Sequence, residues 1–230
     1  MALLGNHGSR GLSHPKVDAQ AGLPAGTASY YFRTRQSLLH AIAARVVELD
    51  VADLSMLTEL GGSASAGGVG ASVASAGGAG AKAGPPAVDL GGSEPGPPAM
   101  NLADDGSSGY SGTRGLAALV MLSGTEPWLT RTRARLELML LGRNDPTLAE
   151  EFLDFGTRLY GLARDAVAQW QAGEGSSDGA VPVASADEQA VLVLTYISGV
   201  MMTFVHGMPV VTDVDRLDGQ IRQILRSGGT

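Results

Sequence analysis

The sequence predicts an all-α protein, with a helix-turn-helix near its N-terminus and a bundle of helices in its C-terminal half. Apolar residues recur at three- to five-residue spacings, which is typical of helices with one buried face. No segment sustains the alternation of polar and apolar residues that strands require, and Gly207 and Pro209 interrupt the one β-branched run, at 205–214. Hydrophobic residues make up 44% of the 230 positions, which is enough to bury a core.

Helices are expected at 34–58, about 115–122, 128–142, 147–171, 186–206 and 213–226. Thr34 is placed to cap the first of these, and Gly61 and Gly62 are expected to end it. Gly, Ala, Ser and Pro make up 39 of the 52 residues in 61–112, a composition that predicts a flexible segment. A second, shorter break is expected at 172–186. The predicted units are therefore 1–50, the flexible segment 61–112, and 113–230.

Two short helices joined by a tight turn are predicted within residues 12–39. Ser13 is placed to cap the first helix, and Gly22 supplies the left-handed conformation that ends it. Pro24 suits the start of the second helix, expected around 24–30. That helix is rich in hydroxyl groups, which can reach phosphates or base edges: Thr27, Ser29, Tyr30 and Tyr31.

The charge of the chain is unevenly distributed. The net charge is −7, yet residues 1–47 hold five basic residues and only one acidic residue, Asp18. The basic residues are Arg10, Lys16, Arg33, Arg35 and Arg45. A local cationic patch can bind a polyanion whatever the total charge, although an ordinary solvated surface would have a similar composition.

Residues 12–39 resemble the DNA-binding domain of TetR-type transcriptional regulators. The resemblance lies in Ala21–Gly22–Leu23, Gly26–Thr27, Tyr30–Tyr31–Phe32 and Thr34–Arg35 ahead of Leu38. It implies that a DNA operator is contacted by Ser13, Lys16, Ala25, Gly26, Thr27, Ser29, Tyr30, Tyr31 and Arg35. Asp18 stands where the family usually has Ala, and the first helix of the family pattern is truncated.

The same resemblance implies an all-α body that dimerises and holds an effector pocket. Dimerisation is expected through 147–171 and 186–206, with an apolar stripe that faces either a partner or the subunit's own core: Leu148, Phe152, Phe155, Leu159, Leu162 and Val167. A pocket for a small apolar effector would draw on Met and aromatic side chains, which also suit a plain core. These are Met121, Trp128, Met139, Phe155, Tyr160, Trp170, Met201, Met202 and Phe204.

The resemblance thus predicts a ligand-responsive, homodimeric repressor that binds a palindromic operator. The alternative is a helical dimer that binds a small molecule and has lost DNA binding with its first helix. No enzyme is expected, because the Gly-x-Ser-x-Gly match at 175–179 and the glycine-rich segment around Lys82 lack the strand that such motifs need.

Neither a cofactor nor a metal is expected. The four His have no ligand spacing, and the absence of Cys excludes disulfides, Cys-bound zinc and a cysteine nucleophile. It also indicates a reducing, cytoplasmic setting. The N-terminus lacks the apolar run of an export signal, and the longest apolar stretch, 191–205, is short for a membrane span.

Overall fold

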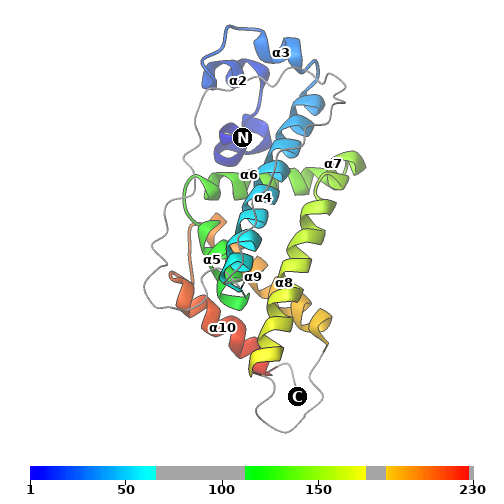
Figure 1. The fold of residues 1–230 in the computed structure, drawn as a ribbon. Coiled ribbons are helices and arrows are strands. Elements are labelled where there is room, and N and C mark those ends of the chain that lie inside the picture. Colours follow the sequence, from blue (N-terminus) through cyan, green and yellow to red (C-terminus); the bar gives the residue numbers. More distant parts are fainter. Residues whose placement is uncertain (66–111, 175–184, 228–230) are drawn as a thin grey trace.

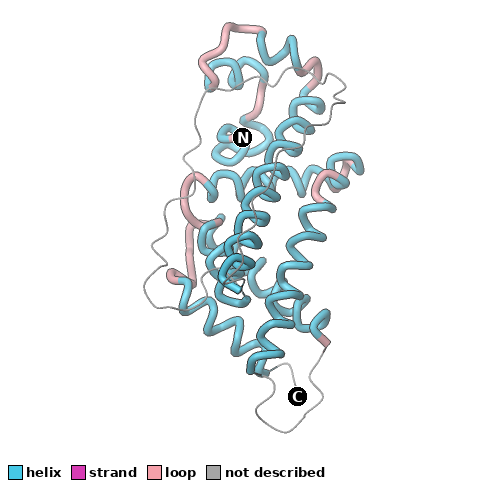
Figure 2. Tube along the Cα trace, viewed as in Figure 1, coloured by secondary structure: helices cyan, strands magenta, loops and turns pink. Residues whose placement is uncertain are grey.

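A computed structural model describes residues 1–65, 112–174 and 185–227. Within these ranges the protein consists of helices joined by short loops, and no strand occurs there (Figure 2). The prediction of an all-α chain is therefore confirmed. Most of the predicted segment 61–112, the glycine-rich segment around Lys82 and the match at 175–179 lie outside the described residues.

Four helices form the N-terminal part of the chain. They are α1 (Ala2–Gly11), which is kinked at Gly8, α2 (His14–Gln20), α3 (Thr27–Tyr31) and α4 (Arg35–Ser65). The long α4 runs from the α2–α3 end of the molecule down into the bundle of the remaining helices (Figure 1). Thr34 caps α4 as expected, because its Oγ1 accepts a hydrogen bond from the Ser37 backbone N–H at 3.0 Å.

Six helices form the described part of the body, residues 112–174 and 185–227. They are α5 (Gly112–Leu122), α6 (Trp128–Gly142), α7 (Pro146–Glu150), α8 (Leu153–Glu174), α9 (Ala186–Val205) and α10 (Val214–Ser227). The predicted bounds of α6, α9 and α10 are confirmed to within one residue. Ser185 and Glu188 form a capping box at the start of α9, which explains its sharp beginning.

The start of α5, at Gly112 rather than about 115, and the end of α8, at Glu174 rather than 171, differ by three residues from the prediction. Three further predicted boundaries are wrong. The α4 helix does not end at Gly61 and Gly62 but continues to Ser65. The segment 147–171 is two helices, α7 and α8, separated by a turn at residues 151 and 152. The α7 helix lies so close to the end of α6 that a Cβ on Gly142 would be 3.2 Å from the Ala149 Cα. The third is the start of the second short helix, which begins at Thr27 rather than near Pro24.

Buried apolar side chains form two clusters along the length of the molecule. One cluster joins α1, α4, α6 and α7 through residues such as Leu4, Val46 and Leu138. The other joins α5, α8, α9 and α10 through residues such as Val193 and Ile221. The first cluster combines helices of the N-terminal part with α6 and α7 of the body, so the N-terminal helices pack directly on the body.

The contact between α1 and α6 is especially close. A Cβ added to Gly5 would lie 2.3 Å from the backbone carbonyl oxygen of Thr130 on α6. On the next turn of α1, the Ser9 backbone N–H donates to Glu137 Oε2 at 3.3 Å. The absence of a side chain at Gly5 is what lets the two helices approach this closely.

One helix in the described residues, α9, is long and apolar enough by composition to cross a membrane. The core helix of a globular protein passes the same test, and α9 has its Gln189 side chain buried and hydrogen-bonded to the Leu225 carbonyl at 3.2 Å. We treat α9 as a packed helix of the body.

Candidate functional site

The α2–α3 turn is built on two glycines in the left-handed region. Gly22 has φ of +64°, which confirms the prediction for this residue, and Gly26 has φ of +92°. L-residues with side chains rarely adopt this region, so both positions favour glycine. Because Gly26 lies in the left-handed region, α3 begins only at Thr27. This corrects the expected start near Pro24.

Asp18 on α2 holds the beginning of α3 in place. Its side chain is buried, and its two carboxylate oxygens accept hydrogen bonds from the backbone N–H groups of Gly26 at 2.8 Å and Ala28 at 2.7 Å. These bonds satisfy N–H groups that a helix start leaves without partners. The residue that departs from the family pattern is therefore the one that fixes the turn.

Asp18 is the only acidic residue among residues 1–47, and its burial keeps a carboxylate away from the outer surface of the turn. The basic side chains of this region, by contrast, are exposed: Arg10, Lys16, Arg33, Arg35 and Arg45. The Arg45 side chain pairs with Glu48 at 2.8 Å. The surface around α2 and α3 therefore presents cations without an exposed carboxylate of its own.

The tyrosines of α3 are its most exposed large side chains. Tyr30 is 78% exposed and Tyr31 is 43% exposed, and their rings meet edge to face with centroids 5.2 Å apart. Lys16, Ala25, Gly26 and Ser29 are also exposed, whereas Ser13 and Thr27 are half-buried. Ser13 occupies the cap position of α2, although its side chain makes no capping hydrogen bond.

Three of the predicted DNA contacts already use their donors within the protein. Thr27 Oγ1 donates to the Pro24 carbonyl at 2.7 Å, and Ser29 Oγ donates to the Gly26 carbonyl at 3.0 Å. Arg35 donates to the Ser9 carbonyl on α1. A hydroxyl has one hydrogen, so in this conformation Thr27 and Ser29 can accept but cannot donate to a phosphate. The groups with a side-chain donor still available are Ser13, Lys16, the two tyrosines and the remaining N–H groups of Arg35.

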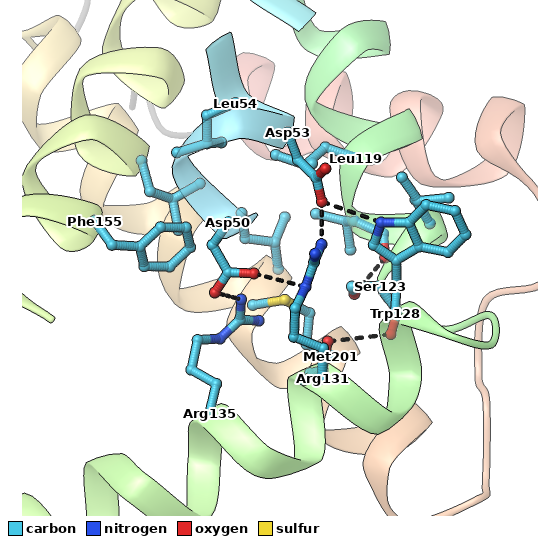
Figure 3. A pocket seen from close by; sticks show the side chains of 15 residues that line it. Asp50, Asp53, Leu54, Leu119, Ser123, Trp128, Arg131, Arg135, Phe155 and Met201 are labelled. Carbon is cyan, nitrogen blue, oxygen red and sulfur yellow. Dashed lines mark hydrogen bonds and ion pairs between the residues drawn. The ribbon is translucent and has the colours of Figure 1, made fainter. Parts of the chain in front are cut away.

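A small cavity of about 50 Å³ lies where α4, α5, α6, α8 and α9 meet (Figure 3). Its apolar lining comes from Leu54, Leu119, Val120, Leu122, Trp128, Phe155, Leu159, Ile197 and Met201. Its polar lining consists of Asp50, Asp53, Ser123, Arg131, Thr132 and Arg135. Pockets that enclose drug-sized ligands measure roughly 300–1,000 Å³, so this cavity must widen to hold more than a few waters.

Two aspartates of α4 and two arginines of α6 form an ion-pair quartet in the wall of the cavity. Arg131 Nε lies 3.0 Å from Asp50 Oδ1, and Arg131 also contacts Asp53 Oδ2 through Nη2. Arg135 Nη1 lies 2.7 Å from Asp50 Oδ2, and Trp128 Nε1 donates to Asp53 Oδ2 at 3.0 Å. Figure 3 shows these four charged side chains meeting between the two helices.

The quartet is almost completely enclosed by protein. Burial raises the pKa of Asp50, and the charges of Arg135 and Arg131 oppose that shift. The Arg135 guanidinium also lies over the Phe155 ring, 5.1 Å from its centroid. Desolvation of buried ion pairs cancels much of their attraction, so the quartet positions α4 on α6 more than it stabilises the fold.

Of the nine residues predicted to form a pocket, Trp128, Phe155 and Met201 line this cavity. The other six do not. Phe204 is buried in the core, and Met121, Tyr160 and Trp170 pack against that core. The Met139 and Met202 side chains are exposed on the surface.

Sequence reasoning missed the four charged residues of the cavity. The signal was present as Asp50 and Asp53, three residues apart, and Arg131 and Arg135, four residues apart. Such pairs each lie on one face of a helix, but charged pairs on a helix face usually meet solvent. Nothing in the sequence indicates that these two faces meet each other.

The apolar stripe considered for dimerisation packs within the chain itself. Leu148, Phe152 and Val167 are buried in the two core clusters, and Leu162 packs against one of them. Phe155 and Leu159 line the cavity. The alternative that this stripe fills the subunit's own core is therefore the arrangement seen here.

No family model, no curated protein and no solved structure matches the chain. Within the described ranges, no group of three or more His, Asp or Glu side chains is arranged to hold a metal ion. The function must therefore be argued from the turn and the cavity themselves.

Proposed function

We propose that the chain is a DNA-binding transcriptional regulator of the TetR type, a homodimer whose operator binding responds to a small molecule. The observation that carries this proposal is the α2–α3 turn. Its one carboxylate, Asp18, is buried and used to fix the start of α3, while Lys16, Tyr30 and Tyr31 are exposed. Exposed cations, phenols and a closely held turn are the groups that contact phosphates and base edges in a major groove.

The proposed division of roles on DNA follows from the hydrogen-bond inventory. Phosphate oxygens only accept hydrogen bonds, so phosphate contacts come from the side chains that still have a donor available: Ser13, Lys16, Tyr30, Tyr31 and Arg35. The Thr27 and Ser29 hydroxyls already donate to backbone carbonyls and serve as acceptors toward base amino groups. Arg35 donates to the Ser9 carbonyl through Nη2 and keeps its other N–H groups for a phosphate.

The proposed dimer uses α8 and α9, which pack side by side. On α9, the side chains of Val191, Leu192 and Met202 are exposed. Thr195 and Ser198 are also exposed, but their hydroxyls donate to carbonyls of their own helix at 2.8 and 2.7 Å. This face suits a second helix, and two copies would place their α3 helices in major grooves roughly 34–36 Å apart.

The proposed response to a ligand rests on α4. This helix begins four residues after α3 and carries Asp50 and Asp53 into the cavity wall. A ligand that prefers a wider cavity favours a different position of α4 relative to α6. The free energy by which the ligand weakens DNA binding is limited to the free energy by which it prefers that state.

The test measures binding of purified protein to duplex DNA from upstream of its own gene as salt is raised. Binding should weaken steeply, and Lys16→Gln should lower the slope of log affinity against log salt by about 0.9. Arg158→Gln is the matched control, because Arg158 is an exposed cation on α8, paired with Asp154 at 2.9 Å. A DNA affinity that does not change with salt concentration would contradict the proposal. So would equal slopes of log affinity against log salt for the two variants.

A second candidate is a dimer that binds a small molecule and no DNA. It is favoured by the internal use of the Thr27 and Ser29 hydroxyl donors. The salt titration separates the two candidates. The second candidate predicts no specific binding of the upstream DNA, while its cavity still binds the ligand.

A further inference from the structure

We propose that the cavity selects a small neutral molecule with an apolar body and one hydroxyl-type hydrogen-bond donor, which binds Asp53. This inference rests on the ligand-responsive role proposed above and names the chemical class of the ligand. Three features support it: the charge balance of the quartet, one carboxylate oxygen and the apolar walls.

The charges of the cavity wall cancel. Asp50 and Asp53 bring two negative charges, and Arg131 and Arg135 bring two positive charges that contact them directly. A ligand carboxylate would have to displace an aspartate from its arginine, and a ligand ammonium would lie beside two guanidiniums. Either ion loses its hydration without gaining an unpaired counter-charge, so a neutral ligand is favoured.

One oxygen of the quartet has no partner in the described part of the chain. Asp53 Oδ2 accepts hydrogen bonds from Trp128 Nε1 and Arg131 Nη2, whereas Asp53 Oδ1 accepts none there and is open to solvent, so a ligand would replace water at it. The Asp53 side chain is 19% exposed, more than that of Asp50 at 4%. A carboxylate oxygen only accepts, so the ligand group that satisfies it is a donor such as a hydroxyl.

The remaining walls favour an apolar body of limited size. Leu159, Ile197 and Met201 line the cavity. The Phe155 ring lies at one side of it (Figure 3). The volume of about 50 Å³ is small, and Met201 is the side chain that adapts most readily to a guest. A six-carbon alcohol is a suitable probe because it requires only a moderate widening.

Trp128 provides a direct readout, since its indole N–H bonds to Asp53 in the cavity wall. The chain has two tryptophans, so Trp170→Phe leaves Trp128 as the sole emitter. We would titrate this variant, without DNA, with 1-hexanol, hexanoate and hexylammonium. The expected result is saturable binding of 1-hexanol, at least tenfold tighter than either ion. Calorimetry on the unmodified chain makes the same comparison independently of the substitution.

Leu119→Phe places extra volume at a half-buried position in the cavity lining. It should weaken 1-hexanol binding at least tenfold. Leu140→Phe is the matched control on exposed surface outside the lining and should leave binding unchanged. Equal or tighter binding of an ion, no saturable binding of the alcohol, or equal effects of the two variants would overturn the inference.

The two proposals fail separately. Saturable, cavity-dependent binding of 1-hexanol together with no salt-dependent DNA binding would overturn the proposed regulator and keep the ligand class. Salt-dependent operator binding without selective binding of the alcohol would overturn the ligand class and keep the proposed regulator.

Discussion

Asp18 in α2 and Asp50 in α4 are both almost completely buried, with 3% and 4% of their surfaces exposed, yet they are satisfied in opposite ways. Asp18 accepts from two backbone N–H groups eight and ten residues further along the chain. Asp50 pairs with the side chains of Arg131 and Arg135, more than eighty residues away in sequence. The first carboxylate shapes one turn, and the second joins two helices that the sequence keeps far apart.

The largest expected effect is on the long-range pair. Arg131→Ala removes the side chain that contacts both Asp50 and Asp53 and leaves buried negative charge uncompensated. We expect the free energy of unfolding to fall by about 3–5 kcal/mol. Denaturant titration measures this, with Arg158→Ala as the exposed control, which should cost no more than about 0.5 kcal/mol. Similar losses of stability in the two variants would mean that the quartet is not buried as described.

A smaller and more local effect is expected for the turn. Asp18→Ala leaves the N–H groups of Gly26 and Ala28 without their acceptor, at a cost of about 1–3 kcal/mol. Hydrogen exchange should accelerate at Ala28 while amides in α9 keep their protection, because both hydrogen bonds of the Asp18 carboxylate lie within the turn. Asp18→Asn retains one acceptor oxygen, so its stability and its exchange rate at Ala28 should fall between those of the wild type and those of Asp18→Ala. Uniform acceleration across the chain would contradict a local role.

The smallest expected effect is the pH-dependent stability that Asp145 contributes. Like Asp18, it accepts from a backbone N–H, that of Leu148, and like Asp50 it contacts side chains far away in the sequence, those of Gln36 and His40. Its pKa is lowered, chiefly by the Gln36 hydrogen bond and further by the Leu148 backbone N–H and by His40. The ionised carboxylate therefore stabilises the fold above the ordinary value of 3.8, and this contribution disappears as pH falls through the lowered pKa. The stability difference between wild type and Asp145→Asn should shrink below about pH 4.

Unfolding measurements from pH 3 to pH 6 would check this, with Asp154→Asn as an exposed control. A difference that stays constant across this range would show that ionisation of Asp145 contributes nothing to stability.

The contrast between the two aspartates also explains how much could be predicted from sequence. Helical spacing predicted the all-α class and the bounds of α6, α9 and α10 to within one residue, and Gly22 marked the turn, because these features depend on neighbours in the chain. The capping role of Asp18 was missed, since an acidic residue on a short helix looks like ordinary surface. The quartet was missed because it depends on which faces of α4 and α6 meet, and periodicity does not report that.

The α6 helix contacts both the cavity and α1. It therefore links the cavity to the N-terminal end of the molecule, as α4 also does. One side of α6 carries Arg131 and Arg135 into the cavity wall, and Thr130 and Glu137 on it meet α1. Gly5 leaves no spare volume against Thr130, so a shift of α6 toward α1 cannot be absorbed between them and must carry α1 with it. A guest that pushes on α6 therefore moves the first residues of the chain even if α4 stays where it is.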